Sequence, residues 1–360
     1  YGSSNGSTAV KEFVAESKGP LNKKDRVEVL GQADSGLPSW REVIQPPPDV
    51  ANGTYRNAEF AADLAQVASG TASIEYQDPV EFFARTYVTS GMRKLLVEAL
   101  KRVTGQGGEP VIQLKTAFGG GKTHSMLALY HLLGGKVQAD DLPNVRETLI
   151  EAGVSALPRA HVAVLVGTAL DPASTKRPND QPGITINTLW GEMAAQLVKS
   201  AGNPKLYDFI KEADKKGTSP GSEALAKLFD ACGPCLILVD ELVAYARKIG
   251  DKTNLPAGSF ENLLSFVQEL TEAARRSKYA LVAVSIPESN IEIGEEFGQR
   301  AQKAIENVFK RMDAIWQPVA AQEGFEVVRR RLFLDCKDTA ARHRVCKAFH
   351  KLYIENENDF

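Results

Sequence analysis

The sequence predicts an α/β fold in which helices flank a parallel sheet, and three observations support this prediction. Short apolar runs alternate along the chain with segments whose apolar residues recur every three or four positions. A glycine-rich loop separates one such run from a helical segment within residues 111–133. Another apolar run, residues 235–241, ends in two acids. Strands buried on both faces of a parallel sheet have this composition, because helices cover both faces.

The composition is that of a globular protein with room for about two domains. The 360 residues are 43% hydrophobic and 24% charged, and the net charge of −2 shows no global excess that would indicate nucleic-acid binding. Four cysteines are too few for a disulfide scaffold of this size. No apolar run reaches the roughly 18 residues of a membrane helix. No signal peptide is visible either, so we expect no membrane contact and a cytoplasmic location.

Pattern and composition divide the chain into three parts. Residues 1–56 are rich in glycine, proline and serine, and they predict an irregular N-terminal arm. Residues 57–320 carry the alternating apolar pattern and predict the core with its preceding helices. Residues 321–360 predict the start of a helical lid.

The segment before the first strand has helical periodicity at residues 57–67 and again after Asp78-Pro79. Proline is favoured at the first position of a helix. Three aromatic residues of this segment could pack in the core, which we favour, or stack on a nucleobase: Phe82, Phe83 and Tyr87.

Residues 111–133 have the order of a strand, a phosphate-binding loop and a helix. Glycines let backbone N–H groups surround an anion, and the N-terminus of the following helix adds a favourable dipole. Lys122 would reach the outer phosphates, and the Thr123 hydroxyl would bind Mg²⁺. Thr116 stands where the usual GxxxxGK[ST] pattern has its first glycine. The expected nucleotide-binding residues are Thr116, Ala117, Phe118, Gly119, Gly120, Gly121, Lys122, Thr123 and His124.

The acidic pair at the end of residues 235–241 provides the second half of such a site. Ligands bind at the carboxyl ends of the strands in open α/β sheets. Asp240 would hold Mg²⁺ together with Thr123, and Glu241 would polarise the water that attacks the γ-phosphate. Acids also occur at helix N-termini for electrostatic reasons alone. The upstream phosphate loop favours the catalytic interpretation.

The other elements alternate in the same way. In chain order we predict a helix at 140–152, a strand at 161–166, a polar loop at 170–183, helices at 185–199 and 225–229, a helix at 259–277, a strand at 280–286, a helix at 295–310, a fifth strand at 314–319 and a helix at 323–334.

Two further residues complete the expected catalytic set. Ser285, near the end of the fourth strand, would touch the attacking water or the γ-phosphate, or it is an ordinary serine of a strand end. Twelve Lys or Arg residues stand against six Asp or Glu residues between Arg300 and Lys351. This excess indicates either a solvated helical surface or an arginine finger, Arg311, that reaches the nucleotide of a neighbouring subunit. In the second case the arginines at 329–331 would sense nucleotide in their own subunit.

Two cysteine patterns have alternative interpretations. Cys232-Gly233-Pro234-Cys235 matches a redox CxxC, but it follows a helix and opens a strand, whereas a redox site follows a strand and opens a helix. We interpret it as a turn. A second set could bind zinc or be scattered along an amphipathic helix, and the lack of a CxxC-like knuckle favours the helix. This set is Cys336, His343, Cys346 and His350.

The order of these motifs indicates a particular class of nucleotide-binding fold. The phosphate loop follows the first strand, the acids follow the third, and a polar residue lies on the fourth. This is the order of the P-loop ATPases that carry a catalytic glutamate and an inserted strand, the AAA+ group. We therefore predict an α/β P-loop NTPase of AAA+/ASCE type, with a parallel five-stranded sheet flanked by helices, an N-terminal extension and the start of a helical lid.

Several stretches also resemble one family within this group. They include FGGGKTHSMLALYHLL, TINTLWGEMAAQL, GPCLILVDELVAYAR and EGFEVVRRRLF. Residues 50–358 resemble the large AAA+-type ATPases found beside DNA methyltransferases and helicases in bacterial phage-defence and restriction islands. Members of that family run far beyond this C-terminus, so the resemblance implies that the lid and downstream parts are mostly missing here.

The resemblance implies Mg²⁺-dependent hydrolysis of ATP to ADP and phosphate, which would power or gate assembly of an anti-phage or DNA-modification complex. The implied partners are ATP, further copies of the chain, and methyltransferase or helicase subunits, with direct DNA contact left open. The alternative is a nucleotide-gated binding or signalling module that hydrolyses little ATP.

Overall fold

The computed structural model describes residues 40–53, 62–116, 121–135, 137–287, 296–309, 315–316 and 323–356. The chain forms two compact units. The larger unit is Thr54–Leu332, and the smaller unit combines Tyr1–Gly53 with Phe333–Phe360. The sheet and the predicted site residues belong to the larger unit.

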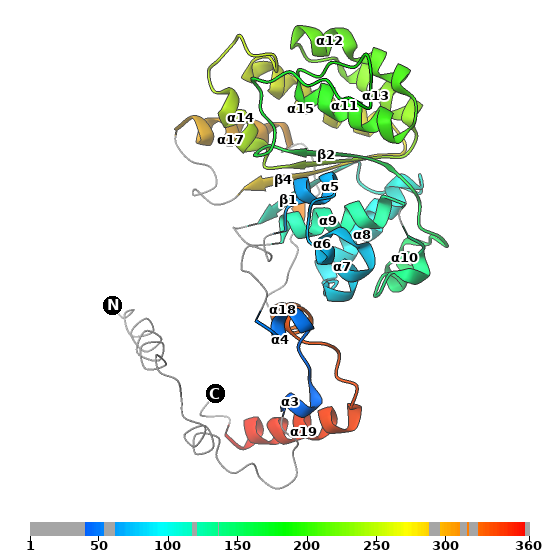
Figure 1. Ribbon diagram of the computed structural model, residues 1–360, viewed down its shortest axis with the longest axis vertical. Coiled ribbons are helices and arrows are strands. Elements are labelled where there is room, and N and C mark those ends of the chain that lie inside the picture. The colour runs from blue at the N-terminus through cyan, green and yellow to red at the C-terminus, as the bar shows by residue number, and fades with distance from the viewer. Residues whose placement is uncertain are drawn as a thin grey trace. The chain divides into compact units, whose positions relative to one another are not determined.

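A parallel sheet is the centre of the larger unit (Figure 1). Its strands are β1 (Val111–Thr116), β2 (His161–Val166), β3 (Cys235–Asp240) and β4 (Ala280–Pro287), and they lie in the order β2-β3-β4-β1. Every residue of β3 and β4 is buried. The predicted parallel sheet with helices on its faces is therefore confirmed.

The predicted five-stranded sheet needs correction, because the sheet consists of four full strands. Among the described residues the expected fifth strand is represented only by β5 (Ile315–Trp316), two residues that pair in parallel with Gln113 and Leu114 of β1. Two paired residues are fewer than a strand of ordinary length has. The other residues of the predicted strand lie outside the described ranges.

Two apolar cores lie on the two faces of the sheet, because successive strand residues point to opposite faces. In β3, Leu236 and Leu238 belong to one core, and Ile237 and Val239 belong to the other. The first core includes α5 (Leu64–Ser69), α6 (Ile74–Gln77), α7 (Pro79–Arg85), α8 (Ser90–Val103), α9 (Lys122–Leu133) and α10 (Arg146–Ala152) (Figure 1). The second includes α11 (Leu189–Ser200), α13 (Ser222–Cys232), α14 (Leu242–Ile249), α15 (Phe260–Arg276) and α17 (Glu296–Phe309).

Two predicted helix starts are confirmed in detail. Asp78 precedes Pro79 at the start of α7, and its carboxylate accepts hydrogen bonds from Val80 N and Glu81 N. Ser259 caps α15 by accepting from Asn262 N. The remaining described elements are α3 (Trp40–Val43), α4 (Pro48–Ala51), the 3₁₀ segments η2 (Ala139–Asp141) and η3 (Pro204–Phe209), α12 (Lys211–Lys216), α18 (Gly324–Leu332) and α19 (Thr339–Glu355).

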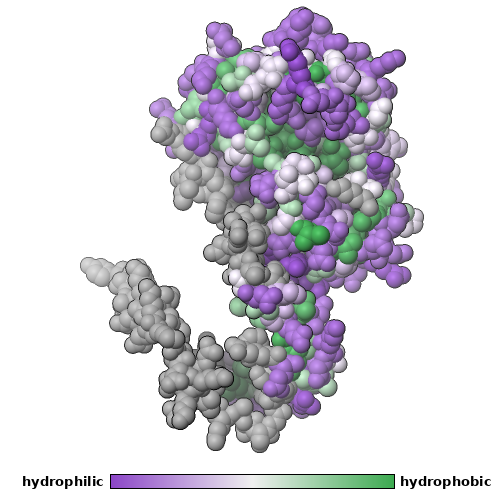
Figure 2. Space-filling view, in the orientation of Figure 1, coloured by the Kyte–Doolittle hydropathy of each residue, from purple (hydrophilic) through white to green (hydrophobic). Residues whose placement is uncertain are grey.

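Hydrophilic side chains cover most of the visible face of the larger unit (Figure 2). Phe82 and Phe83 are fully buried, which confirms the core-packing interpretation for both residues. Within the described ranges, every helix is too short or too polar to cross a membrane.

Candidate functional site

The described residues of the predicted phosphate loop lie at the end of β1 and at the start of α9. Thr116 is the last residue of β1, and Gly121 precedes Lys122, the first residue of α9. Gly121 has φ +79°, a left-handed backbone conformation that glycine adopts without the clash of a Cβ atom. The intervening residues Ala117, Phe118, Gly119 and Gly120 lie outside the described part of the chain, as does Arg311.

Thr123 and Asp240 are in direct contact. The Thr123 hydroxyl donates a hydrogen bond to Asp240 Oδ2 at 2.9 Å, although the two residues are 117 positions apart in the chain. Asp240 is only 4% exposed. A hydroxyl and a carboxylate are hard oxygen ligands of the kind that Mg²⁺ prefers, with water and phosphate oxygens completing the coordination. The structure thus brings together the two residues that the sequence predicts as metal ligands.

Ser285 belongs to the same hydrogen-bond network. The sheet register sets Val239 of β3 beside Val284 of β4, so the following residues Asp240 and Ser285 lie level at the carboxyl edge. The Ser285 hydroxyl donates to Asp240 Oδ1 and accepts from Glu241 N at 3.0 Å. Ser285 is 2% exposed, so it holds the carboxylate in one orientation from inside the sheet.

Glu241 has an uncommon backbone conformation. It precedes α14 with φ +54°, in the left-handed region that few residues other than glycine adopt. Such conformations cluster at functional sites, where the surrounding structure compensates their cost. Gly167, which follows β2, has no room for a side chain, because a Cβ atom there would lie 2.1 Å from Glu241 O.

Thr168 is a site residue that the sequence reasoning missed. Its hydroxyl donates a hydrogen bond to Glu241 Oε2. Thr168 follows the end of β2, the strand that neighbours β3, so it lies at the same carboxyl edge as the acids. Its place directly after a predicted strand was the one signal in the sequence that could have identified it.

His124 packs against α7. Thr86 donates its hydroxyl proton to Phe82 O at 2.7 Å, so the 2.9 Å contact with His124 Nε2 requires that Nε2 donate to Thr86 Oγ1. The imidazole ring also stacks on Phe82, with ring centroids 4.6 Å apart. Burial is the main cause that lowers the pKa of His124 to about 4, and the nearby Arg331 and His131 lower it further. The side chain is therefore neutral at pH 7.

The arginines of α18 have different surroundings. Arg331 donates to Glu75 Oε1 at 2.9 Å and to the Tyr76 hydroxyl at 3.1 Å, and Glu75 also binds Arg85 at 3.0 Å. Tyr76 in turn meets the His124 ring edge to face at 6.5 Å. Arg329 pairs with Glu326, and Arg330 lies 3.4 Å from Asn144 Oδ1. Through Tyr76, Arg331 is thus connected to His124 of α9.

The LWGE stretch, residues 189–192, has a structural explanation. Asp214 is buried and accepts hydrogen bonds from Thr188 N, the Thr188 hydroxyl and the Tyr207 hydroxyl, at 2.9, 2.6 and 3.0 Å. A Cβ atom on Gly191 would lie 2.0 Å from Asp214 Oδ1. The glycine therefore allows α11 to approach this carboxylate.

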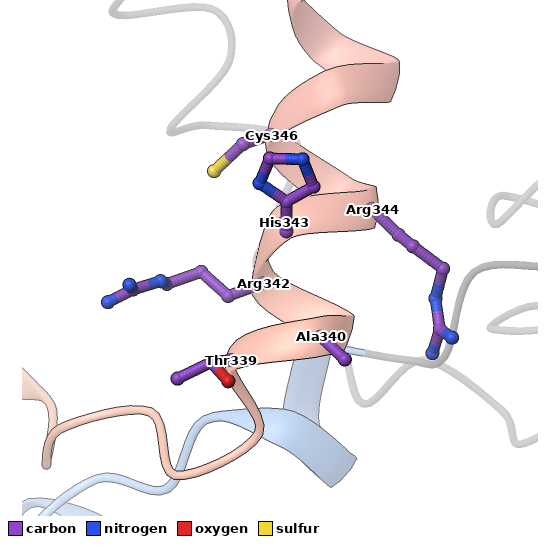
Figure 3. Close-up of a pocket in the computed structure, with 6 residues that line it drawn as sticks. All are labelled: Thr339, Ala340, Arg342, His343, Arg344 and Cys346. Carbon is purple, nitrogen blue, oxygen red and sulfur yellow. The ribbon is translucent and has the colours of Figure 1, made fainter.

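The two cysteine patterns lie at a turn from helix to strand and along α19 with the residues just before it. Cys232 ends α13 and Cys235 begins β3, as the interpretation of a turn requires, and both thiols are buried and free. A hollow of about 720 Å³ in the smaller unit is lined by residues of α19, including His343 and Cys346 (Figure 3). Two arginines line it as well, and their charge opposes a metal cation. No three His, Cys, Asp or Glu side chains gather as a metal site in the described ranges.

Comparison with known proteins identifies one family. The model of the DUF499 N-terminal domain matches residues 44–324, which include β1 to β5 and the predicted nucleotide-binding residues. No curated protein and no solved structure matches the chain.

Proposed function

We propose that this chain, which belongs to the DUF499 N-terminal domain family, binds ATP with Mg²⁺ at the carboxyl edge of its sheet and hydrolyses it to ADP and phosphate. The observation that carries the proposal is the hydrogen bond from Thr123 to Asp240, with Ser285 on the other carboxylate oxygen. These residues come from three separate segments and meet at the carboxyl edge of the sheet, beside the first turn of α9.

The strand order supports the finer assignment to the AAA+ type of P-loop ATPase. β4 lies between β1 and β3, so it sets Ser285 between the strand of the loop and the strand of the acids. The order of the sequence motifs predicts an inserted strand, and the position of β4 supports that prediction.

Each residue has a role in the proposed reaction. Lys122 contacts the β- and γ-phosphates, and Thr123 and Asp240 hold the magnesium ion and its water ligands. Bound Mg²⁺ would neutralise charge on the phosphate oxygens. Glu241 orients and deprotonates the attacking water. We further propose that Arg311 of a neighbouring subunit contacts the γ-phosphate, in the manner of an arginine finger.

The resemblance to ATPases of phage-defence islands supports a cellular role for ATP hydrolysis. We propose that hydrolysis powers or gates assembly of a bacterial anti-phage or DNA-modification complex, with further copies of the chain or methyltransferase and helicase subunits as partners. One observation favours the second candidate, a nucleotide-gated module with little hydrolysis. Thr168 binds one carboxylate oxygen of Glu241, and in that second candidate the hydrogen bond would hold the carboxylate away from the attacking water.

Lys122→Ala tests nucleotide binding. The variant loses the compact positive charge at the phosphates, so we expect ATP affinity, measured by isothermal titration, to fall about a hundredfold or more while the fold stays intact. Lys94→Ala is the matched control, because Lys94 is an exposed lysine of α8. Unchanged ATP affinity in Lys122→Ala would refute the phosphate-loop assignment.

Glu241→Gln separates binding from hydrolysis. The amide keeps the shape of the side chain and removes the base, so ATP binding should persist while turnover falls by about 10²–10⁴. Phosphate release with and without double-stranded DNA measures this effect. A wild-type protein that binds ATP and releases no phosphate would favour the nucleotide-gated module.

A further inference from the structure

Lys248 binds the loop that follows β2. Its side-chain Nζ donates hydrogen bonds to the carbonyl oxygens of Gly167 and Leu170, at 3.0 and 2.7 Å, and to that of Thr168. An ammonium group has three N–H donors, and these three carbonyls use all of them. The positive charge strengthens each of the bonds.

We propose that Lys248 is a positioning residue for ATP hydrolysis: it fixes the loop of residues 167–170, and through Thr168 it orients the carboxylate of Glu241. The inference rests on the proposed function, because Glu241 is the base of that reaction. In this role Lys248 acts through Thr168, because its three N–H donors bind the carbonyls of the loop.

The geometry of α14 explains how one residue reaches this loop. Glu241 immediately precedes the helix, and Lys248 follows it by seven positions, which is about two turns and nearly the same helix face. Long side chains on a helix point back toward its N-terminus. The Lys248 side chain therefore extends back along α14 toward the end where Glu241 lies.

Hydrogen bonds hold both the amides and the carbonyls of residues 167–170. The amides bind strand backbone, since Gly167 N donates to Asp240 O at 2.9 Å and Leu170 N donates to Val166 O at 3.1 Å. The carbonyls accept from Lys248. Gly167 also lies so close to Glu241 that no Cβ atom fits between them. These contacts hold residues 167–170 in a fixed place beside the start of α14.

This position determines where the base points. A glutamate side chain has several rotatable bonds, and an exposed one samples many rotamers. The Thr168 hydroxyl binds Oε2 of Glu241, which leaves Oε1 to accept the proton of a water molecule. Without Lys248, the three carbonyls lose their common donor, Thr168 moves, and the carboxylate loses its fixed direction.

The test is a kinetic comparison on the 360-residue chain. Lys248→Met keeps the length of the side chain and removes its donors. We expect kcat for ATP hydrolysis to fall about ten- to a hundredfold, as for a misplaced catalytic group, with little change in the Kd for ATP. Lys248→Arg keeps a charged donor and should recover part of the loss. Lys252→Met, which removes a neighbouring exposed lysine, is the control and should leave kcat unchanged.

The double variant Lys248→Met/Thr168→Ala distinguishes positioning from general damage. If Lys248 acts through Thr168, the double variant should be no slower than Thr168→Ala alone, because the two losses are one and the same. Additive losses would overturn the inference. So would a Lys248→Met variant that turns over as fast as wild type or faster, since the contact would then not assist hydrolysis.

A structural readout separates this inference from the proposed function. If the wild-type chain binds ATP without hydrolysing it, the hydrolytic proposal fails, and the crystal structure of Lys248→Met decides about the lysine. Loss of the Thr168–Glu241 hydrogen bond in that structure supports the positioning role. Its persistence with the loop unmoved overturns the role.

Discussion

Ser285→Ala tests the hydrogen bonds around Asp240. The Ser285 hydroxyl makes two contacts in a buried position, one to Asp240 Oδ1 and one from Glu241 N. The alanine variant loses both. Glu241 N also donates to Asp240 Oδ1 at 3.1 Å, so no backbone N–H is left without an acceptor. The net loss is one hydrogen bond to a buried carboxylate.

The magnitude follows from this single bond. A hydrogen bond to a charged group contributes about 1.5–3 kcal/mol to stability. We therefore expect the free energy of unfolding of the larger unit to fall by about 2 kcal/mol, or about 4 °C in Tm for a unit of this size. Asp240 keeps the bond from Thr123 but loses the restraint on its other oxygen. We expect the apparent Mg²⁺ affinity in the presence of ATP to fall about tenfold, which is equivalent to about 1.4 kcal/mol.

Calorimetric unfolding and a Mg²⁺ titration of ATP binding measure the two effects. Ser277→Ala is the matched control, because Ser277 is 1% exposed and precedes β4 at the opposite, amino edge of the sheet. It should leave Mg²⁺ affinity unchanged. A Ser285→Ala variant with the Tm and Mg²⁺ affinity of wild type would refute the hydrogen-bond network. A lower Tm with unchanged Mg²⁺ affinity would support the network and refute the role of Asp240 at the metal.

Two further predictions concern stability. Gly191→Ala should lower the free energy of unfolding by about 3 kcal/mol or more, because the new Cβ atom displaces the buried Asp214 from its hydrogen-bond donors. Gly324→Ala, at a helical position with open space around it, is the control and should leave stability unchanged. Equal denaturant midpoints for the two variants would contradict this account. The pKa of His124 is about 4, below the roughly 6.5 of an unfolded chain, so its stabilising contribution is present above pH 6.5 and is lost as the pH falls toward 4. When the pH falls from 6.5 to 4.5, the free energy of unfolding of His124→Gln, measured in urea, should therefore decrease by about 2 kcal/mol less than that of the wild type. Equal decreases for the two proteins would show that the pKa of His124 is not lowered in the folded state.

The sequence by itself determined four strands and the position of the motifs on them. The strand predicted at 161–166 coincides with β2, and the strands predicted to begin at residues 111, 235 and 280 begin there as β1, β3 and β4. Continuous apolar composition is a local property, and burial on both faces of a parallel sheet is its direct physical cause. Because Asp240 ends one such run, its place at the carboxyl edge follows from the sequence alone.

Only the tertiary structure decided which polar residues meet at that edge. Thr168 precedes Glu241 by 73 positions and lies in a polar segment without periodicity, so no local pattern joins the two. The sequence predicts only that Gly167 ends a strand. The structure shows that the backbone of Glu241 lies too close to Gly167 for any side chain there. Among three consecutive arginines of α18, packing brings Arg331 against Glu75. Contacts between polar side chains depend on how packing brings distant segments together, and that information is absent from hydrophobic periodicity.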